Sequence, residues 1–199
     1  FISAFLGCSI GAIIGTISAF AGGKVDIVIQ RFIDIMLSFP IIVLAIIVIA
    51  VMPKNVVLGI DINLIVAISI PFIPKVARVI RSAALTIVTL PYIDAARAAG
   101  YSSKRIVFRH ILPNVLSPLI VLLTLNIPDT ILMETTLSFL GFGIQPPRTS
   151  LGLMLGLGRD YLLTAWWIAV VPGVAIFLTT LSISLVGDWL RDRFDPTLK

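Results

Sequence analysis

The sequence predicts an all-α protein that crosses a membrane several times. Its 199 residues are 58% hydrophobic and only 13% charged, whereas soluble domains carry roughly 25% charged residues. Residues 1–23 contain no charged side chain, and about 20 apolar residues in a helix cross the hydrocarbon core of a bilayer. The net charge of +5 comes from basic residues that flank such apolar runs, which favours a membrane protein over a nucleic-acid-binding one. We therefore expect one transmembrane helical domain over residues 1–199.

Five apolar segments are expected to span the membrane. Gly22-Gly23 ends the first segment, a polar connection covers residues 24–34, and Pro53 ends the second segment. Pro71 and Pro74 are expected to kink the third. The expected spans are residues 1–23, residues 35–53, a run that begins near residue 62, residues 114–139 and residues 161–187.

The stretch before the fifth segment, residues 141–158, is rich in Gly and Pro. It is expected to form a loop that is partly re-entrant. Trp166 and Trp167 lie near one end of the fifth segment and Trp189 lies past the other, as in the aromatic belts of membrane interfaces.

The longest polar run, at about residues 82–113, separates the third and fourth segments. Residues 75–109 contain seven Lys or Arg and a single acid, Asp94. Residues 94–99 are rich in Ala, which favours a helix. Gly100 is the residue type expected just past a helix end. The polar run therefore predicts a short helix followed by a break.

A second short helix is expected after this break. Ser102 or Ser103 can cap it, and Pro113 is expected to start the next span, where its missing N–H costs nothing. Two pairs of apolar residues lie four apart and share a helix face: Val107 with Ile111, and Phe108 with Leu112.

The same residues resemble the EAA loop of permease subunits of ATP-binding-cassette (ABC) importers. The spacing of Asp94-Ala95-Ala96, Gly100 and Leu112-Pro113 matches that loop. The chain is most similar to the dipeptide, oligopeptide and nickel branch of the family, over nearly its whole length. The further motifs are Arg109-His110-Ile111-Leu112-Pro113-Asn114, Leu137-Ser138-Phe139-Leu140-Gly141-Phe142-Gly143, Gln145-Pro146-Pro147, Gly158-Arg159-Asp160-Tyr161-Leu162-Leu163 and Gly187-Asp188-Trp189-Leu190-Arg191-Asp192.

The chain departs from the family pattern in two places. Asp94 stands where the family usually has Glu, which keeps the negative charge. The chain also opens at Phe1 inside an apolar run, where family members normally carry another membrane helix and a cytoplasmic lead-in. We therefore expect a partial chain of a subunit that has six spans when intact.

The resemblance implies a type I ABC importer permease with a helical-bundle fold. Its expected partners are ABC ATPase subunits, a second permease subunit, an extracytoplasmic substrate-binding protein and membrane lipid. The expected substrates are dipeptides or oligopeptides. The residues that the resemblance assigns to ATPase docking and coupling are Asp94, Ala95, Ala96, Arg97, Gly100, His110, Leu112 and Pro113.

The residues themselves argue against a nucleotide or metal site in this chain. Gly22-Gly23-Lys24 is followed by Val25 and lacks the spaced glycines and the Ser or Thr of a P-loop. ATP and magnesium are therefore expected on partner subunits, and no cofactor is expected here. With one Cys and one His, neither a disulfide nor a zinc site is expected. Cys8 is interpreted as apolar filling, and His110 as a hydrogen-bonding or docking residue.

Lys75, Arg78 and Arg81 lie three residues apart and share a helix face. They are expected to anchor the helix by reaching the lipid headgroups. With the loop at 82–113 on the cytoplasmic side, twelve Lys or Arg lie on that side and three on the other. The positive-inside rule then predicts a cytoplasmic loop and a cytoplasmic C-terminus. The three residues on the opposite side are Lys54, Arg148 and Arg159.

Asp129 and Glu134 are carboxylates inside an apolar segment, and such groups usually face protein or water. One interpretation is that they line a translocation path and meet a peptide ammonium or a cation. The other is that they cap a helix break at Pro128 or pair with an Arg of a neighbouring subunit. Five residues turn a helix by about 140°, so the two are not expected to share one wall.

Three other functions compete with a peptide permease. An ABC permease for nickel or another small solute would share most of the motifs. An ion-coupled secondary transporter would use Asp129 and Glu134 as ion sites next to broken helices. A membrane enzyme would need a cluster of His, Asp or Glu in one cavity, which a single His and scattered acids do not favour.

Overall fold

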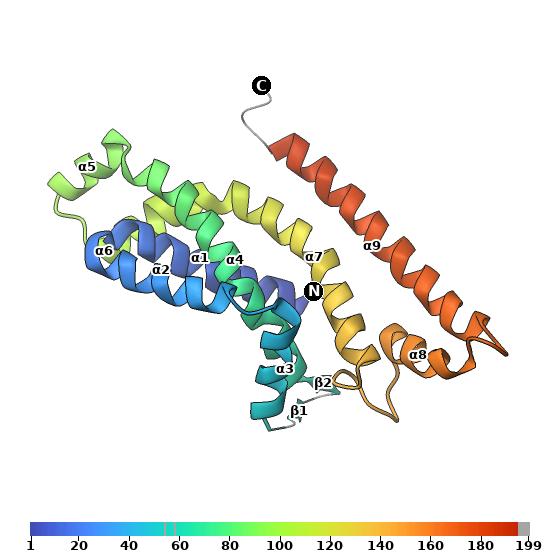
Figure 1. Ribbon diagram of the computed structural model, residues 1–199. Coiled ribbons are helices and arrows are strands. Elements are labelled where there is room, and N and C mark those ends of the chain that lie inside the picture. The colour runs from blue at the N-terminus through green and yellow to red at the C-terminus, as the bar shows by residue number, and fades with distance from the viewer. Residues whose placement is uncertain (54, 58, 195–199) are drawn as a thin grey trace.

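A computed structural model describes the backbone of residues 1–53, 55–57 and 59–194 (Figure 1). Lys54 and Lys199, which were assigned to opposite sides of the membrane, lie outside these described residues. The described part is almost entirely helical, with one two-stranded antiparallel sheet that pairs Val56 with Asp61 and Val57 with Ile60.

The elements follow one another in a simple order. They are α1 (Ile2–Ala21), α2 (Gly23–Leu37), α3 (Ile41–Val51), β1 (Val56–Val57), β2 (Ile60–Asp61), α4 (Ile62–Val88), α5 (Pro91–Ala98), α6 (Ser103–Ile106), a π-helical turn (Val107–Ile111), a 3-10 turn (Leu112–Val115), α7 (Leu116–Phe139), α8 (Leu151–Gly158), a 3-10 turn (Arg159–Tyr161) and α9 (Trp167–Phe194).

The helical membrane fold predicted from the sequence is confirmed. Within the described residues, four helical stretches are long and apolar enough to cross a membrane: α1, α4, the continuous run Ser103–Phe139, and α9. A fifth span results when α2 and α3 are counted together, although they are bent by 94° at the break between them.

The second segment differs from its prediction. Residues 24–34 were expected to be a polar connection before a span at 35–53, but they belong to α2. The helix breaks at residues 38–40 instead. Pro40 explains the break, because it has no N–H to donate and disfavours helical geometry in the residue before it.

The last segment also differs in its bounds. The expected loop at 141–158 contains α8, whose first turn is capped by the Ser150 hydroxyl accepting from the Leu153 amide at 3.2 Å. The last helix begins at Trp167 instead of residue 161 and runs past Trp189, which was expected beyond its end. The tryptophans therefore mark the start and the interior of α9.

Close backbone contact joins α1 to α4 along a stripe of glycines. Gly7, Gly11 and Gly15 are four residues apart and face the α4 backbone; a Cβ added to Gly15 would lie 2.4 Å from the Ala77 carbonyl oxygen. Small residues at this spacing let two membrane helices approach closely. The stripe makes α1 and α4 the centre of the bundle.

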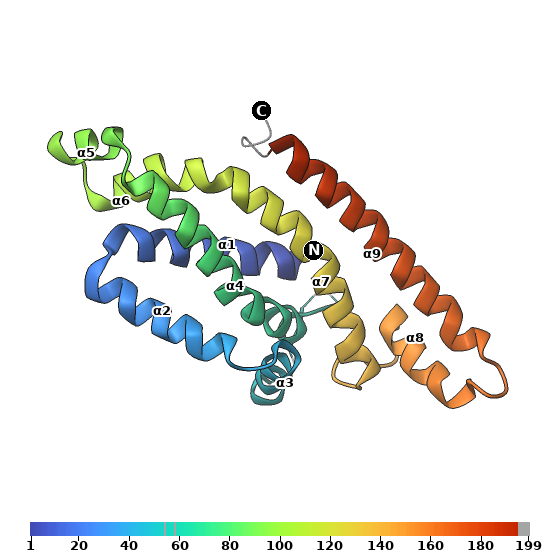
Figure 2. The same cartoon turned by 45° about the horizontal axis from the view of Figure 1, so that its top comes forward.

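Figure 2 shows α9 on the far side of α7 from α1, α2 and α4, and α9 packs against α7 and α8. In Figure 1, α5 and α6 lie at one end of the molecule, and β1, β2 and α8 lie at the other. The loop that links α4 to α7 is thus separated from the β1–β2 turn by the length of the bundle.

Candidate functional site

The first half of the candidate site is α5, which ends before Gly100 as predicted but begins at Pro91, three residues before the predicted Ala-rich stretch. Pro91 occupies the first turn, where no N–H is needed. Gly100 has a φ of +76° and follows the last helical turn. The Tyr101 amide donates to the Ala96 carbonyl at 3.1 Å and closes the helix end. Gly100 is therefore confirmed as the residue that ends this helix.

The two faces of α5 differ sharply. Ile93 is fully buried and Ala96 is nearly so, in a core shared with α1, α4 and α7. Asp94, Ala95 and Arg97 point outward, and Asp94 and Arg97 form an exposed ion pair at 3.4 Å. The structure thus separates the predicted docking residues. Ala96 packs against its own chain, whereas Asp94, Ala95 and Arg97 are exposed, with the Arg97 guanidinium 5.4 Å from the centre of the Phe20 ring of α1.

The second half of the site forms a continuous helical rod with α7. The Ser102 hydroxyl accepts from the Arg105 amide at 3.4 Å and starts α6. The predicted pair of Val107 and Ile111 is confirmed as buried on one face. In the other predicted pair, Phe108 is exposed and Leu112 packs partly against the core.

Pro113 does not start a separate span as predicted, because the helical path runs on from Ser103 to Phe139. The path widens into a π-turn at Val107–Ile111 and narrows to a 3-10 turn at Leu112–Val115. Proline removes one N–H and its ring crowds the preceding turn, so a helix that continues through it must change its winding locally. The loop therefore joins the interior of α7 without a flexible link.

His110 connects the two halves of the loop. Its ring stacks on Tyr101, with 5.9 Å between centroids and 22° between planes, and lies 6.5 Å from the Tyr92 ring of α5. The Arg105 guanidinium also lies over the Tyr101 ring, at 4.1 Å from the ring centroid. Asn114 donates to the His110 carbonyl at 2.6 Å. In this structure His110 is a packing centre within the loop.

Three ion pairs run along one face of α4. Lys75 pairs with Asp129 of α7 at 3.1 Å, and Arg78 and Arg81 pair with Asp34 and Asp26 of α2. These three basic residues were predicted to reach the headgroups, but each has a carboxylate of its own chain. These partners were not predicted, because they lie on elements far away in the sequence.

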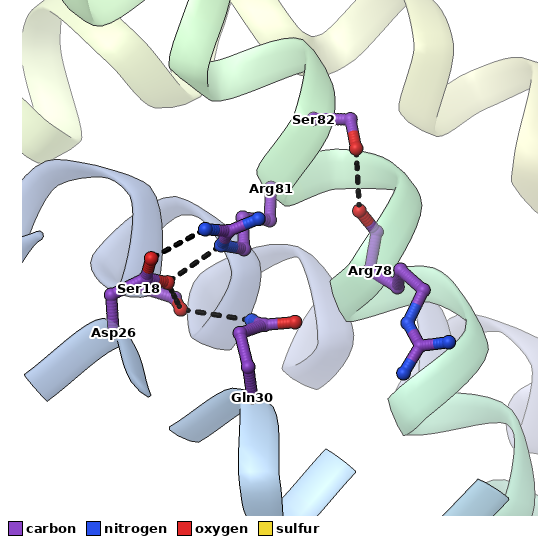
Figure 3. Close-up of polar contacts among 6 residues, drawn as sticks. All are labelled: Ser18, Asp26, Gln30, Arg78, Arg81 and Ser82. Atoms are coloured by element: carbon purple, nitrogen blue, oxygen red, sulfur yellow. Dashed lines mark hydrogen bonds and ion pairs between the residues drawn. The ribbon is translucent and has the colours of Figure 1, made fainter. Parts of the chain in front are cut away.

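The Asp26–Arg81 pair is the most enclosed of the three (Figure 3). Its side chains are only 15% and 26% exposed, and Arg81 Nε donates to Asp26 at 2.6 Å. The Ser18 hydroxyl also donates to Asp26 at 2.5 Å, and Gln30 donates to Ser18 at 3.0 Å. This cluster ties α1, α2 and α4 together just before α4 reaches the loop.

The structure keeps Asp129 and Glu134 apart. Asp129 lines a groove of about 310 Å³ with residues of α3, α4 and α7, and Glu134 does not. Glu134 accepts from the Ser138 hydroxyl at 2.6 Å, and the Ser138 oxygen accepts from the Ile144 amide at 3.3 Å. Because α7 runs unbroken through Pro128, Asp129 does not cap a break there.

The chain is similar to known transport proteins. Residues 11–199 match the model of a family described as binding-protein-dependent transport system inner membrane component. A putative peptide transport system permease protein of Brucella suis is 44% identical over 98% of this chain and 64% of its own length. A di/tripeptide transport system permease protein of Pseudomonas aeruginosa is 39% identical over 95% of this chain and 61% of its own. The chain thus spans less than two thirds of these relatives.

A solved structure shares the fold. It is described as an inward-facing conformation of the MetNI methionine ABC transporter, and it superimposes with a TM-score of 0.73 over 98% of this chain and 90% of that one. The two sequences are 24% identical.

Proposed function

The chain belongs to the family of binding-protein-dependent transport system inner membrane components, and from this membership we propose that it is a permease subunit of an ATP-driven importer of peptides. The names of the relatives in Brucella suis and Pseudomonas aeruginosa support peptides as the substrate class. We place the protein in the inner membrane, with the loop between α4 and α7 on the cytoplasmic side. The basic residues are concentrated around this loop, and cytoplasmic loops carry an excess of Lys and Arg.

The two-faced α5 carries this proposal. Its inner face is held by the chain's own core through Ile93 and Ala96, and its outer face presents Asp94, Ala95 and Arg97. A short helix that is fixed on one side and free on the other can receive a partner and pass on its movement. We assign the outer face to docking on an ATPase subunit that binds ATP and magnesium.

The remaining predicted coupling residues connect α5 to the membrane. Gly100 ends α5, His110 packs against both halves of the loop, and Leu112 and Pro113 lie in the rod that continues into α7. Displacement of α5 would thus tilt α7 as a unit. In this mechanism a second permease subunit completes the path, and an extracytoplasmic substrate-binding protein delivers the peptide.

Substitution of Ala95 in the full-length subunit tests this function. We expect Ala95→Trp to abolish co-purification of the ATPase and ATP-dependent peptide uptake, while membrane insertion stays normal because Ala95 lies outside the core. Ala95→Ser is the matched control and should retain both activities. Wild-type association and uptake in Ala95→Trp would contradict the docking role.

The same uptake assay separates the competing functions. Uptake that persists without ATP and collapses with the ion gradient would identify a secondary transporter. ATP-dependent uptake of nickel or another small solute, without peptide uptake, would change the substrate class.

A further inference from the structure

The Lys75–Asp129 ion pair lies at an unusual depth. Lys75 is the central residue of α4, about 20 Å along the helix from either end. Asp129 lies close to the middle of α7. The Lys75 ammonium and the Asp129 carboxylate are 3.1 Å apart, and their side chains are 50% and 47% exposed. Two half-exposed charges therefore occupy the middle of two membrane-spanning helices.

Such charges cannot face lipid without a large cost, so this surface must meet water or protein. The surface is hollowed beside the pair, where Asp129 contributes the only carboxylate among the described residues that line the groove of about 310 Å³. The other lining residues are Ile41, Ile42, Phe72, Leu132, Met133 and Thr136. A mostly apolar groove with one carboxylate at its edge suits a ligand that has an ammonium group next to an apolar body.

The three ion pairs of α4 differ in how firmly they are held. Asp26 receives hydrogen bonds from Ser18 and from two nitrogens of Arg81, and its side chain is only 15% exposed. Among the described contacts, Asp129 has a single charged partner, Lys75. An exposed pair with one contact contributes little stability, so a ligand can replace it at low cost.

We propose, resting on the proposed function, that Lys75 and Asp129 form an exchangeable ion pair that binds zwitterionic peptides inside the translocation path. The α-ammonium of the peptide binds Asp129, and the terminal carboxylate binds Lys75. In the absence of substrate the two side chains neutralise each other. The pair joins the two helices that flank the coupling loop, so the movement that tilts α7 also separates Lys75 from Asp129 and frees both charges.

Uptake by the intact transporter in proteoliposomes tests this site. The substrates are one labelled tripeptide with free termini and the same peptide with an acetylated amino terminus. We expect Asp129→Asn to raise the concentration for half-maximal uptake of the free peptide about tenfold, as for the loss of one charge-assisted hydrogen bond. Uptake of the acetylated peptide should not change. The binding protein is the same in all variants, and so is any selection that it makes. A change in the ratio of free-peptide to acetylated-peptide uptake is therefore caused by the permease.

Two further variants make the result specific. Lys75→Gln should weaken uptake of the free peptide but not of its carboxyl-terminal amide, which gives a second reading if Asp129→Asn fails to fold. Asp34→Asn is the matched control. It breaks the ion pair between Asp34 and Arg78 of α4, which is as exposed as the Lys75–Asp129 pair, and Asp34 does not line the groove. It should leave the preference for free termini unchanged.

Equal losses for free and blocked peptides in Asp129→Asn and Lys75→Gln would overturn the inference and leave the pair a structural role. The proposed function would stand in that case. A wild-type transporter without ATP-dependent peptide uptake would overturn both.

Discussion

Substitution of Gly15 by Ala should weaken the contact between α1 and α4. The added Cβ would lie 2.4 Å from the Ala77 carbonyl oxygen and 2.9 Å from the Arg81 amide nitrogen. Ordinary contacts begin at 3.4 Å, so the two helices must separate by about 1 Å, which a close-packed interior resists. Both neighbours are backbone atoms, and no change of rotamer can relieve the clash.

The expected loss can be worked out from two opposing effects. Overpacking costs about 1–3 kcal/mol, and the rigid backbone contact places Gly15 near the upper end of that range. Ala gains about 1 kcal/mol over Gly as a helix former. The net result is a decrease of about 2 kcal/mol in the free energy of unfolding.

Gly173→Ala in α9 provides the matched control. The added Cβ there meets only the end of the flexible Leu155 side chain, at 3.2 Å. A shift of a few tenths of an ångström in that side chain relieves the contact, so the gain in helix propensity is kept. Reversible unfolding of the full-length subunit in mixed detergent and SDS micelles, followed by circular dichroism, compares the two variants. If Gly15→Ala is as stable as Gly173→Ala, the close approach of α1 and α4 is wrong.

Three further predictions concern α5, the glycine that follows it and the last turn of α7. Ile93→Ala should lower the free energy of unfolding by about 2–5 kcal/mol in the same assay, because the side chain is fully buried under α5; an unchanged midpoint would refute that packing. Gly100→Val should cost about 1–2 kcal/mol because of its positive φ, and it should impair uptake without affecting membrane insertion; normal uptake would count against a rigid α5. Ser138→Ala should cost about 1–3 kcal/mol, because Glu134 and the Ile144 amide both lose their partner; Glu134→Gln keeps an acceptor for Ser138 and should cost less.

Local signals were sufficient to predict much of the fold. Long apolar runs located α1, α7 and most of α9, because the length of an apolar run that can cross a membrane is set by the bilayer and not by contacts with the rest of the chain. Gly100 and Ser102 located the ends of two helices, because a positive φ and a capping hydroxyl are properties of single positions.

Longer-range pairing explains the failure at α2. Its polar residues look like a connection when they are counted alone, but Asp26, Gln30 and Asp34 are four apart and share a helix face. That face meets Arg78 and Arg81 of α4. The spacing was visible in the sequence, as was that of the glycines in α1, whereas the pairing of Lys75 with Asp129 required the tertiary structure.

The contacts of α4 determine which helices would move together when the loop between α4 and α7 is displaced. The glycine stripe leaves no room for α1 to slide along α4, and the enclosed Asp26–Arg81 cluster fixes α2 to the same body. Packing between α4 and α7 is far less extensive, and its ion pair is half exposed. We therefore expect the boundary between α4 and α7 to yield first. Spin labels at the exposed positions Val79 and Ile120 should change their separation when the assembled transporter binds ATP. Labels at Ile13 and Val79 should not, and equal changes in both pairs would contradict this division.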